Sequence, residues 1–181
     1  GNTVEAMAKQ DQALLAGTVA RNALHGMLVV TVLQVRIDVN RPPWYLACTE
    51  PVPAMEGTRE CNKKVQEGRC GAGHECENPN VRYSMLVEFA DHTASFWAMC
   101  FDQAAERLLG CSARELFDRM RSEEPEATLS QVIHALVGQT VVVNVKRCIA
   151  EYGGRGIERR IVAAGAATAS AHAAALLKLL E

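Results

Sequence analysis

The first strong pattern along the chain is an alternation of apolar and polar residues from Leu24 to Val39. Val, Ile and Leu dominate this run, and the polar residues Gln34 and Arg36 fall between apolar neighbours. β-Branched residues at a period of two are typical of a half-buried strand. Pro42 and Pro43 follow, and because proline donates no ladder hydrogen bond we expect the strand to end before them.

A second alternating pattern predicts a β-hairpin between residues 81 and 101. The two strands, 81–91 and 95–101, follow the turn-forming segment 78–80. The period of two gives each strand two faces. In the first strand one face carries Tyr83, Met85, Val87 and Phe89. In the second strand one face carries Trp97, Met99 and Phe101, and the other carries Phe96, Ala98 and Cys100.

After residue 101 the apolar residues recur at helical spacing. A break at Gly110 and a capping box made by Ser112 and Glu115 predict two short helices that end before Pro125. A third helix is expected over 128–137.

Two further strands, 140–152 and 157–165, flank a Gly-rich turn and predict a second hairpin. The last segment, 166–181, reads as a helix. Its seam of apolar residues repeats at four, three and four over Ala169, Ala173, Leu176 and Leu180, and Leu177 and Leu179 widen it. Such a seam predicts either an assembly helix that joins other chains or a helix that packs back on its own domain.

The order of these elements predicts a mainly β fold with helices. Five strands with a helical segment between the third and the fourth are the order of an OB-fold barrel, a fold that commonly binds single-stranded nucleic acid. We therefore expect a linker or a short leading helix over 1–20, an OB-fold domain over 21–165 with an insertion at 45–80, and a C-terminal helix over 166–181.

Composition and net charge exclude only a few classes of function. The chain has 181 residues, is 49% hydrophobic and carries a net charge of −2, which argues for a globular domain without a uniformly basic coat. A local basic groove remains compatible with this charge. No run of eighteen apolar residues occurs, so no membrane span is expected.

Four of the seven cysteines lie in the segment from Cys48 to Cys76, which is rich in Gly, Pro and charged residues and also contains His74. A segment with so few large apolar residues needs a covalent or metal cross-link to hold a defined fold. Clustered cysteines with a nearby histidine are suitable ligands for a tetrahedral zinc ion. The N-terminus resembles no signal peptide, so we expect a reduced intracellular chain in which a metal is favoured over disulfides. Cys100, Cys111 and Cys148 are expected to be small buried hydrophobes.

Aromatic and basic residues supply candidates for a nucleic-acid surface. Trp97 and Phe101 are four residues apart on one strand face, about 13 Å, which is enough to stack separate bases, although aromatic residues of a barrel also fill its core. Lys63, Lys64 and Arg82 flank this face and are candidate phosphate contacts. The window 144–160 carries a local excess of positive charge that includes Lys146 and Arg155.

Six stretches of the chain together resemble one known family. They read YLACTE, ECNKKV, GRC, NPNVRYSMLVEFAD, FWAMCF and RLLGCSARELFD. The chain is similar, over about residues 24–181, to the C-terminal DNA-binding domain of the large subunit of replication protein A, the eukaryotic single-strand DNA-binding heterotrimer.

The resemblance implies an OB-fold with an inserted zinc ribbon that binds single-stranded DNA in replication, repair and recombination in the nucleus. It implies that the C-terminal helix joins a three-helix bundle with the middle and small subunits. It also implies that four aromatic residues face DNA: Tyr83, Trp97, Phe101 and Tyr152.

The cysteine spacing departs from the family pattern. Twelve residues separate Cys48 from Cys61, and five separate Cys70 from Cys76, whereas the family uses short pairs. The expected site holds one structural Zn²⁺ per chain on Cys48, Cys61, Cys70 and a fourth ligand. Resemblance to a four-thiolate site favours Cys76, and His74 is the alternative at a shorter spacing. Either set is closed, with no open position for catalysis.

Two other functions compete with single-strand binding. The chain could be a zinc-containing OB scaffold or protein-interaction module of a telomere- or meiosis-specific paralogue. A zinc hydrolase is disfavoured because no HExxH motif, nucleophile elbow or paired catalytic carboxylates occur, so no enzyme and no small-molecule substrate are expected.

Overall fold

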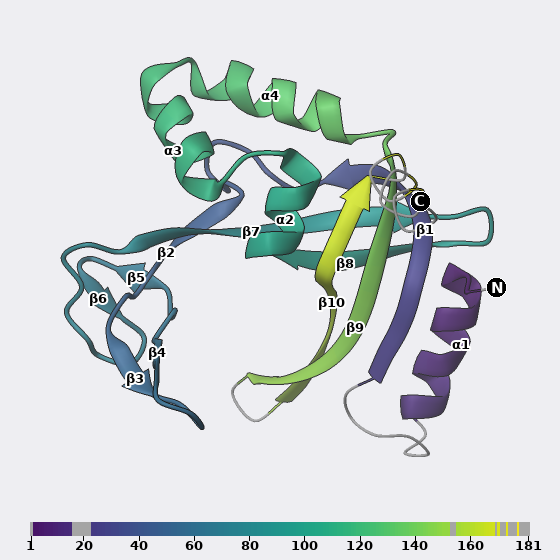
Figure 1. Cartoon of the computed structure of the whole chain (residues 1–181), viewed down its shortest axis with the longest axis horizontal. Helices are drawn as coiled ribbons and strands as arrows, with labels where there is room; N and C mark the ends of the chain where they lie inside the picture. Colours follow the sequence, from purple (N-terminus) through teal and green to yellow (C-terminus); the bar gives the residue numbers. More distant parts are fainter. Residues whose placement is uncertain are drawn as a thin grey trace.

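The computed structural model describes residues 2–15, 23–152 and 155–168, together with Ser170, Ala173 and Leu177. Five long strands build a mixed sheet (Figure 1). They are β1 (Ala23–Val35), β7 (Asn80–Ala90), β8 (Ser95–Phe101), β9 (Thr140–Tyr152) and β10 (Arg155–Thr168). The strands pair in the order β1-β9-β10-β8-β7, and β7 pairs again with β1. The β8–β10 pairing is parallel and the others are antiparallel.

The core lies on the inner face of these strands because their side chains alternate. Along β7 every second residue from Val81 to Phe89 is buried, and along β8 Phe96, Ala98 and Cys100 are buried. Both predicted hairpin faces are therefore confirmed. β1 contributes Leu28, Val30 and Val32 to the same core.

The first strand and the segment that follows it differ from the prediction. β1 ends at Val35, four residues before the predicted end at Val39. A short strand that the sequence pattern did not reveal, β2 (Trp44–Ala47), follows the two prolines and pairs with the first residues of β7. β1 ends before the turn bridged by Asp38 and Arg41, so the prolines do not terminate it. Both prolines precede the first residue of β2 and therefore leave that strand free to form.

Three helices lie between β8 and β9, namely α2 (Asp102–Leu109), α3 (Ala113–Ser122) and α4 (Pro125–Leu136). Gly110 ends α2 with φ 74°, and the predicted capping box of α3 is present, with Ser112 N donating to Glu115 Oε2 at 2.6 Å. α4 begins at Pro125 rather than at the predicted Thr128, because proline at the first helical position loses no helical hydrogen bond.

Residues before β1 form the helix α1 (Val4–Leu15), which packs on the sheet. Val4 and Met7 are buried in the main core, and one turn later Asp11 forms a buried ion pair with Arg147 of β9, with Nε and Oδ1 3.5 Å apart. The three positions recur at helical spacing, so one face of α1 covers the core. The same helix lies beside β1 in Figure 1.

The segment between β2 and β7 forms a separate module that we call the cysteine module, residues 48–79. It holds two small hairpins made by β3 (Pro51–Pro53), β4 (Thr58–Glu60), β5 (Val65–Gln66) and β6 (Arg69–Cys70). Figure 1 shows the module beside the main sheet, joined to it through β2 and β7. Within the described part of the chain, no helix has the length and apolar character that a membrane crossing requires.

Only part of the predicted C-terminal helix lies within the residues that the structure describes. β10 continues to Thr168, three residues beyond the predicted end of the strand. Ala173 and Leu177 are helical and exposed, Leu177 to 64%. Ala169, Leu176 and Leu180 lie outside the described residues.

Candidate metal centre and nucleic-acid groove

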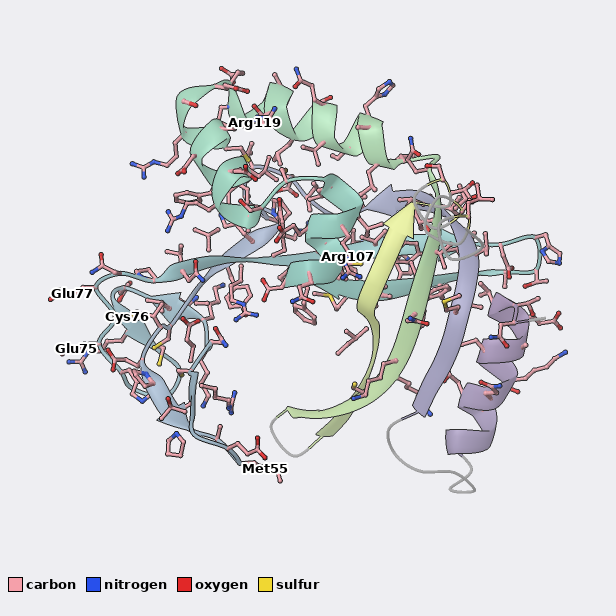
Figure 2. The ribbon with its side chains drawn as sticks, viewed as in Figure 1. Met55, Glu75, Cys76, Glu77, Arg107 and Arg119 are labelled. Atoms are coloured by element: carbon pink, nitrogen blue, oxygen red, sulfur yellow. The ribbon has the colours of Figure 1, made fainter. Side chains whose placement is uncertain are left out.

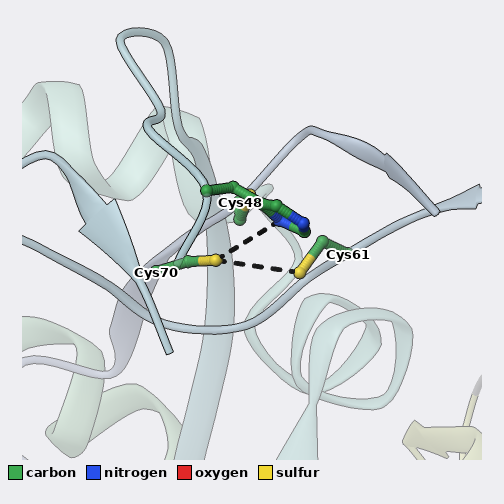
Figure 3. Close-up of side chains that lie close together, drawn as sticks. Cys48, Cys61 and Cys70 are labelled. Carbon is green, nitrogen blue, oxygen red and sulfur yellow. Dashed lines mark hydrogen bonds between the residues drawn. The ribbon is translucent and has the colours of Figure 1, made fainter. Parts of the chain in front are cut away.

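Four side chains of the cysteine module converge on one point. Cys48 follows β2, Cys61 follows β4, Cys70 ends β6 and His74 lies in the turn after it. Their ligand atoms all lie within 4.8 Å of one another, and the three sulfurs are buried. Figure 3 shows Cys48, Cys61 and Cys70 meeting from three separate segments.

The distances between these atoms fit a tetrahedral metal. Cys70 Sγ lies 3.9 Å from Cys61 Sγ and 3.5 Å from His74 Nδ1, and Cys48 Sγ lies 3.7 Å from the same nitrogen. Zinc bond lengths in a tetrahedron place two sulfurs about 3.8 Å apart and a sulfur and a nitrogen about 3.6 Å apart. These three distances are therefore close to those expected around a tetrahedral Zn²⁺ ion.

Backbone hydrogen bonds hold the ligands in this arrangement. Cys48 N donates to Lys63 O and Asn62 N donates to Cys48 O, both at 2.9 Å, which ties the ends of the first two ligand segments together. Cys70 N donates to His74 O at 3.0 Å across a turn in which Gly73 has φ 87°. Only glycine adopts this φ at little cost, so the turn that returns His74 to Cys70 depends on Gly73.

The thiols of the cluster differ in acidity. Burial alone would raise the pKa of Cys70, but hydrogen bonds from the backbone of Ala72 and His74 and from neighbouring thiols lower this pKa to about 6. Burial is also the largest influence on Cys48 and raises its pKa to about 12. One thiolate therefore forms readily, and a bound cation would favour ionisation of the others.

Cys76, which resemblance favoured as the fourth ligand, does not join this cluster. Its sulfur is buried in the module, 3.7 Å from Thr49 Oγ1, and the four-atom group contains His74 instead. Figure 2 places Cys76 in the module between Glu75 and Glu77. The preference for Cys76 over His74 is therefore not supported, because the turn at Gly73 brings the imidazole, rather than the later thiol, to the other three ligands.

Outside the module, the predicted buried cysteines differ in burial. Cys100 is fully buried in the main core, and burial raises its pKa. Cys111 and Cys148 are only partly buried, so the prediction holds fully for Cys100 alone.

The outer face of β7 and β8 forms the floor of a groove. Cross-strand neighbours on this face are Trp97 with Glu88, Met99 with Leu86 and Phe101 with Ser84. A hollow of about 330 Å³ opens over its middle and is lined by Arg36, Arg41, Pro42, Trp44, Tyr45, Lys64, Ser84, Leu86 and Met99. None of these residues is acidic.

A second hollow continues this groove onto the cysteine module. It is lined by Lys63, Lys64, Gln66, Arg69, Cys70 and Gly71, and again contains no acidic residue. Lys64 lines both hollows, so the two share one wall. The two hollows therefore adjoin at Lys64. Among the described residues, the charged side chains in their linings are all basic, and two of them, Arg41 and Arg69, form ion pairs with Asp38 and Glu75.

The predicted DNA contacts fall on this groove to different degrees. Trp97 and Phe101 lie half-buried on the outer face of β8, on either side of Met99, which lines the first hollow, but they line neither hollow themselves. Lys63 and Lys64 are exposed on the module. Arg82 forms an ion pair with Asp102 at the start of α2, which offsets part of its charge.

Three further predicted contacts lie on β9 and β10. Lys146 is exposed on β9, opposite Ile161 of β10. Tyr152 and Arg155 are paired at the tip of the β9–β10 hairpin, but their side chains lie outside the described residues.

The position of Tyr83 contradicts the prediction that this residue faces DNA. Its side chain is 1% exposed, and its hydroxyl donates to the carbonyl oxygens of Cys111 and Ser112, each at 2.9 Å. The ring points into the core because it shares the inner face of β7 with Met85 and Val87. A base cannot stack on a ring in this position.

The groove also contains residues that sequence reasoning missed. Arg36 and Arg41 flank the end of β1, and Tyr45 of β2 donates its hydroxyl to Asn62 O at 3.3 Å. The alternation along the first strand could have assigned Arg36 to the outer face. Tyr45 carried no such signal, because β2 was not predicted.

Comparison with known proteins identifies relatives of this chain. Residues 28–173 match the family model described as the replication factor-A C terminal domain. The chain is 40% identical over 95 residues to a 70 kDa DNA-binding subunit of replication protein A from Oryza sativa subsp. japonica, covering 49% of this chain and 13% of that protein. It is 27% identical over 110 residues to the replication factor A 51 kDa subunit of Crithidia fasciculata, covering 57% of this chain and 21% of that protein. The chain thus corresponds to a minor part of the length of these relatives.

Two solved structures share the fold. One is a replication protein A heterotrimer bound to ssDNA, with a TM-score of 0.65 and 23% identity over 91% of this chain and 36% of that chain. The other is yeast RPA bound to ssDNA, with a TM-score of 0.57 and 23% identity over 86% of this chain and 84% of that chain. The matched family range contains the cysteine module, β7, β8 and the helices before β9. The chain therefore belongs to the replication factor-A C-terminal domain family.

Proposed function

We propose that this chain binds single-stranded DNA in the groove between the outer face of β7 and β8 and the cysteine module. The observation that carries the proposal is that, among the described residues, the charged side chains lining both hollows are all basic: Arg36, Arg41, Lys63, Lys64 and Arg69, of which Arg41 and Arg69 also pair with Asp38 and Glu75. A continuous positive groove follows a phosphate backbone, and its cations favour binding by releasing counterions.

The aromatic residues beside this groove favour a single strand over a duplex. Trp97 and Phe101 lie four residues apart on the outer face of β8. Unpaired bases stack on such rings, whereas the bases of a duplex are already stacked on one another. The circuit of pairings that returns from β7 to β1 supports an OB-fold barrel, whose second and third strands commonly form the binding face.

We further propose one structural Zn²⁺ per chain, held by Cys48, Cys61, Cys70 and His74. Four protein ligands complete a tetrahedron and leave no position for a substrate or an activated water. The ion would therefore stabilise the fold of the module beside the groove rather than catalyse a reaction. The proposed function is DNA binding without enzymatic activity.

The wider role follows from the relatives. Several are named as DNA-binding subunits of replication protein A, and the solved neighbours are assemblies on ssDNA. We propose that the chain acts in the nucleus, in DNA replication, repair and recombination. The C-terminal helix, starting after Thr168 and carrying Ala173 and Leu177, would join the middle and small subunits.

Titration of labelled oligo(dT) with the zinc-loaded chain at low salt tests the binding. We expect affinity that falls steeply as salt increases, because phosphate contacts release counterions. Trp97→Ala should weaken binding by about 5- to 150-fold, the effect of about 1 to 3 kcal/mol for one stacked base.

Tyr83→Phe provides an aromatic control. Tyr83 is buried in the main core and lines neither hollow. Its substitution should leave affinity for oligo(dT) near that of the wild type. Absence of binding by the wild-type chain at low salt would refute the proposed function.

A further inference from the structure

Arg36 lies at the edge of the groove in a position fixed by the backbone. It directly follows β1, and its N–H donates to Leu86 O of β7 at 2.9 Å. Its side chain lines the hollow over β7 and β8. The main chain thus anchors Arg36 beside the strands that form the groove floor, while its guanidinium faces the hollow.

The guanidinium stacks on Trp97. Its central carbon lies 4.4 Å from the centroid of the indole ring, well within the range of a cation–π interaction. A guanidinium carries five N–H donors in one plane. A guanidinium held over a ring can therefore still donate to an anion beside that ring.

The nearby carboxylates are engaged elsewhere. Glu88, opposite Trp97 on β7, accepts a hydrogen bond from Ser95 Oγ at 2.9 Å. Asp38 pairs with Arg41 at 3.5 Å. Within the part of the chain that the structure describes, no ion pair is formed by Arg36, so its charge is not neutralised by a neighbouring acid.

We infer that Arg36 and Trp97 act as one nucleotide-binding unit, in which Arg36 holds the indole by stacking on it and donates to the phosphate of the nucleotide whose base Trp97 stacks. This inference rests on the proposed single-strand binding. It assigns a contact to a residue outside the predicted set and explains why a cation lies against the aromatic platform.

Two substitutions separate the charge of Arg36 from its shape. Arg36→Gln removes the charge, and we expect affinity for oligo(dT) to fall about 5- to 30-fold at moderate salt, with the slope of log K against log salt shallower by about 0.7, one phosphate on a single strand. Arg36→Lys keeps the charge but loses the planar stack. It should recover the slope and only part of the affinity.

Arg121→Gln is the matched control. Arg121 of α3 is also exposed and also lies over an aromatic ring, 5.7 Å from the centroid of Phe117, but it lines neither hollow of the groove. Loss of this charge should change neither the affinity nor the slope. Equal thermal unfolding of the three variants would show that the Arg36 effects arise in binding.

A double-mutant cycle between Arg36 and Trp97 tests whether the two residues act together or whether Arg36 acts as an independent surface charge. Arg36→Gln should cost less in a Trp97→Ala background than alone, because the indole no longer orients the nucleotide. With Trp44→Phe, Trp97 is the remaining tryptophan of the two in the chain. Arg36→Gln in that background should shift its emission before DNA is added.

The outcomes are distinct. Wild-type binding with an unchanged slope and affinity in Arg36→Gln would overturn the inference and leave the proposed function standing. Full additivity with Trp97→Ala would also overturn it, since the two residues would then act independently. A wild-type chain that does not bind oligo(dT) would overturn both.

Discussion

Tyr83 connects the main sheet to the segment between α2 and α3. Its ring fills the core, and its hydroxyl donates to two backbone carbonyls at Cys111 and Ser112. Burial, followed by the neighbouring Cys111 and nearby carboxylates, raises the pKa of this phenol, so it remains a protonated donor at physiological pH. Its contribution is to position the helices rather than to contact a ligand.

Tyr83→Phe should therefore reduce stability without changing binding. The substitution keeps the ring but removes the hydroxyl that two partly buried carbonyls share, a loss of about 1 kcal/mol. Urea unfolding monitored by circular dichroism measures this change, and oligo(dT) titration of the folded variant checks the affinity. A variant with unchanged stability and impaired binding would instead indicate that Tyr83 contacts DNA.

His74 and Cys76 offer a second test at the scale of single residues. His74→Ala should lower the bound zinc well below one ion per chain, whereas Cys76→Ser should retain it, because only the imidazole lies with the other three ligand atoms. Elemental analysis gives the stoichiometry. The visible spectrum after cobalt replacement distinguishes three thiolates from four, and the opposite pattern of metal loss would identify Cys76 as the ligand.

Helix α1 is attached at its first turn by the loop after β7. Asp91 Oδ2 accepts from Val4 N at 2.8 Å, and Asp91 Oδ1 accepts from Thr93 N at 2.7 Å. Burial would raise the pKa of Asp91, but these hydrogen bonds and those from the Thr93 hydroxyl and Ala94 N outweigh it and lower the pKa to about 2. A carboxylate at a helix N-terminus is also favoured by the helix dipole.

The attachment of α1 should therefore weaken in acid. A carboxyl group whose pKa is lower in the folded state contributes its stability above its ordinary pKa, near 3.8, and loses it as the pH falls toward 2. Asp91→Ala should be less stable than the wild type at neutral pH, and the difference should shrink between about pH 4 and pH 2. Unfolding curves across this range measure it, and a constant difference would contradict the assigned role.

The C-terminal helix can be tested as an element. Its predicted seam includes Leu176 and Leu180, and the neighbouring Leu177 is 64% exposed. A double substitution, Leu176→Asp with Leu180→Asp, should prevent co-purification with the middle and small subunits, because two charges would be buried in the bundle. Binding of oligo(dT) by the chain alone should persist, and unchanged co-purification would indicate a helix that packs on its own domain.

At the scale of the whole molecule, the main core and the module differ in what holds them together. The main core contains large apolar side chains from every long strand, whereas the buried cluster of the module consists of Cys48, Cys61, Cys70 and Cys76 with a single valine, Val65. So small an apolar cluster cannot offset the entropy of ordering the module. We therefore expect the fold of the module to depend on the proposed Zn²⁺.

Zinc chelation should unfold the module and leave the main sheet folded. Hydrogen exchange should increase across residues 48–79 and stay slow in β7 and β9, because the core between these strands shares almost no side chain with the module. Affinity for oligo(dT) should fall, since Lys63 and Lys64 would lose their place beside the groove. Loss of the entire circular-dichroism signal would contradict this division.

Local patterns predicted most of the fold. Alternation identified the long strands and their buried faces, and the capping box located the start of α3, because these features depend on neighbours within a few residues. The short strand β2 and the start of α4 were missed. Each lies at or just after a proline, and its structure depends on pairing or packing with distant segments.

The candidate site was predicted less completely. Cys48, Cys61 and Cys70 could be recognised by their residue type and clustering, as could the basic pair Lys63 and Lys64. Spacing alone could not choose between His74 and Cys76, because the choice depends on the path of a glycine-containing turn in space.

The sequence by itself determined which residues form strands, which faces of them are apolar and that a cysteine-rich insertion interrupts the sheet, because periodicity and residue chemistry are local properties. Tertiary structure decided that Tyr83 belongs to the core, that His74 lies with the three cysteines and that Arg36 lies over Trp97. These relations join residues from separate elements, and only the pairing of the strands and the turns of the module bring them into contact.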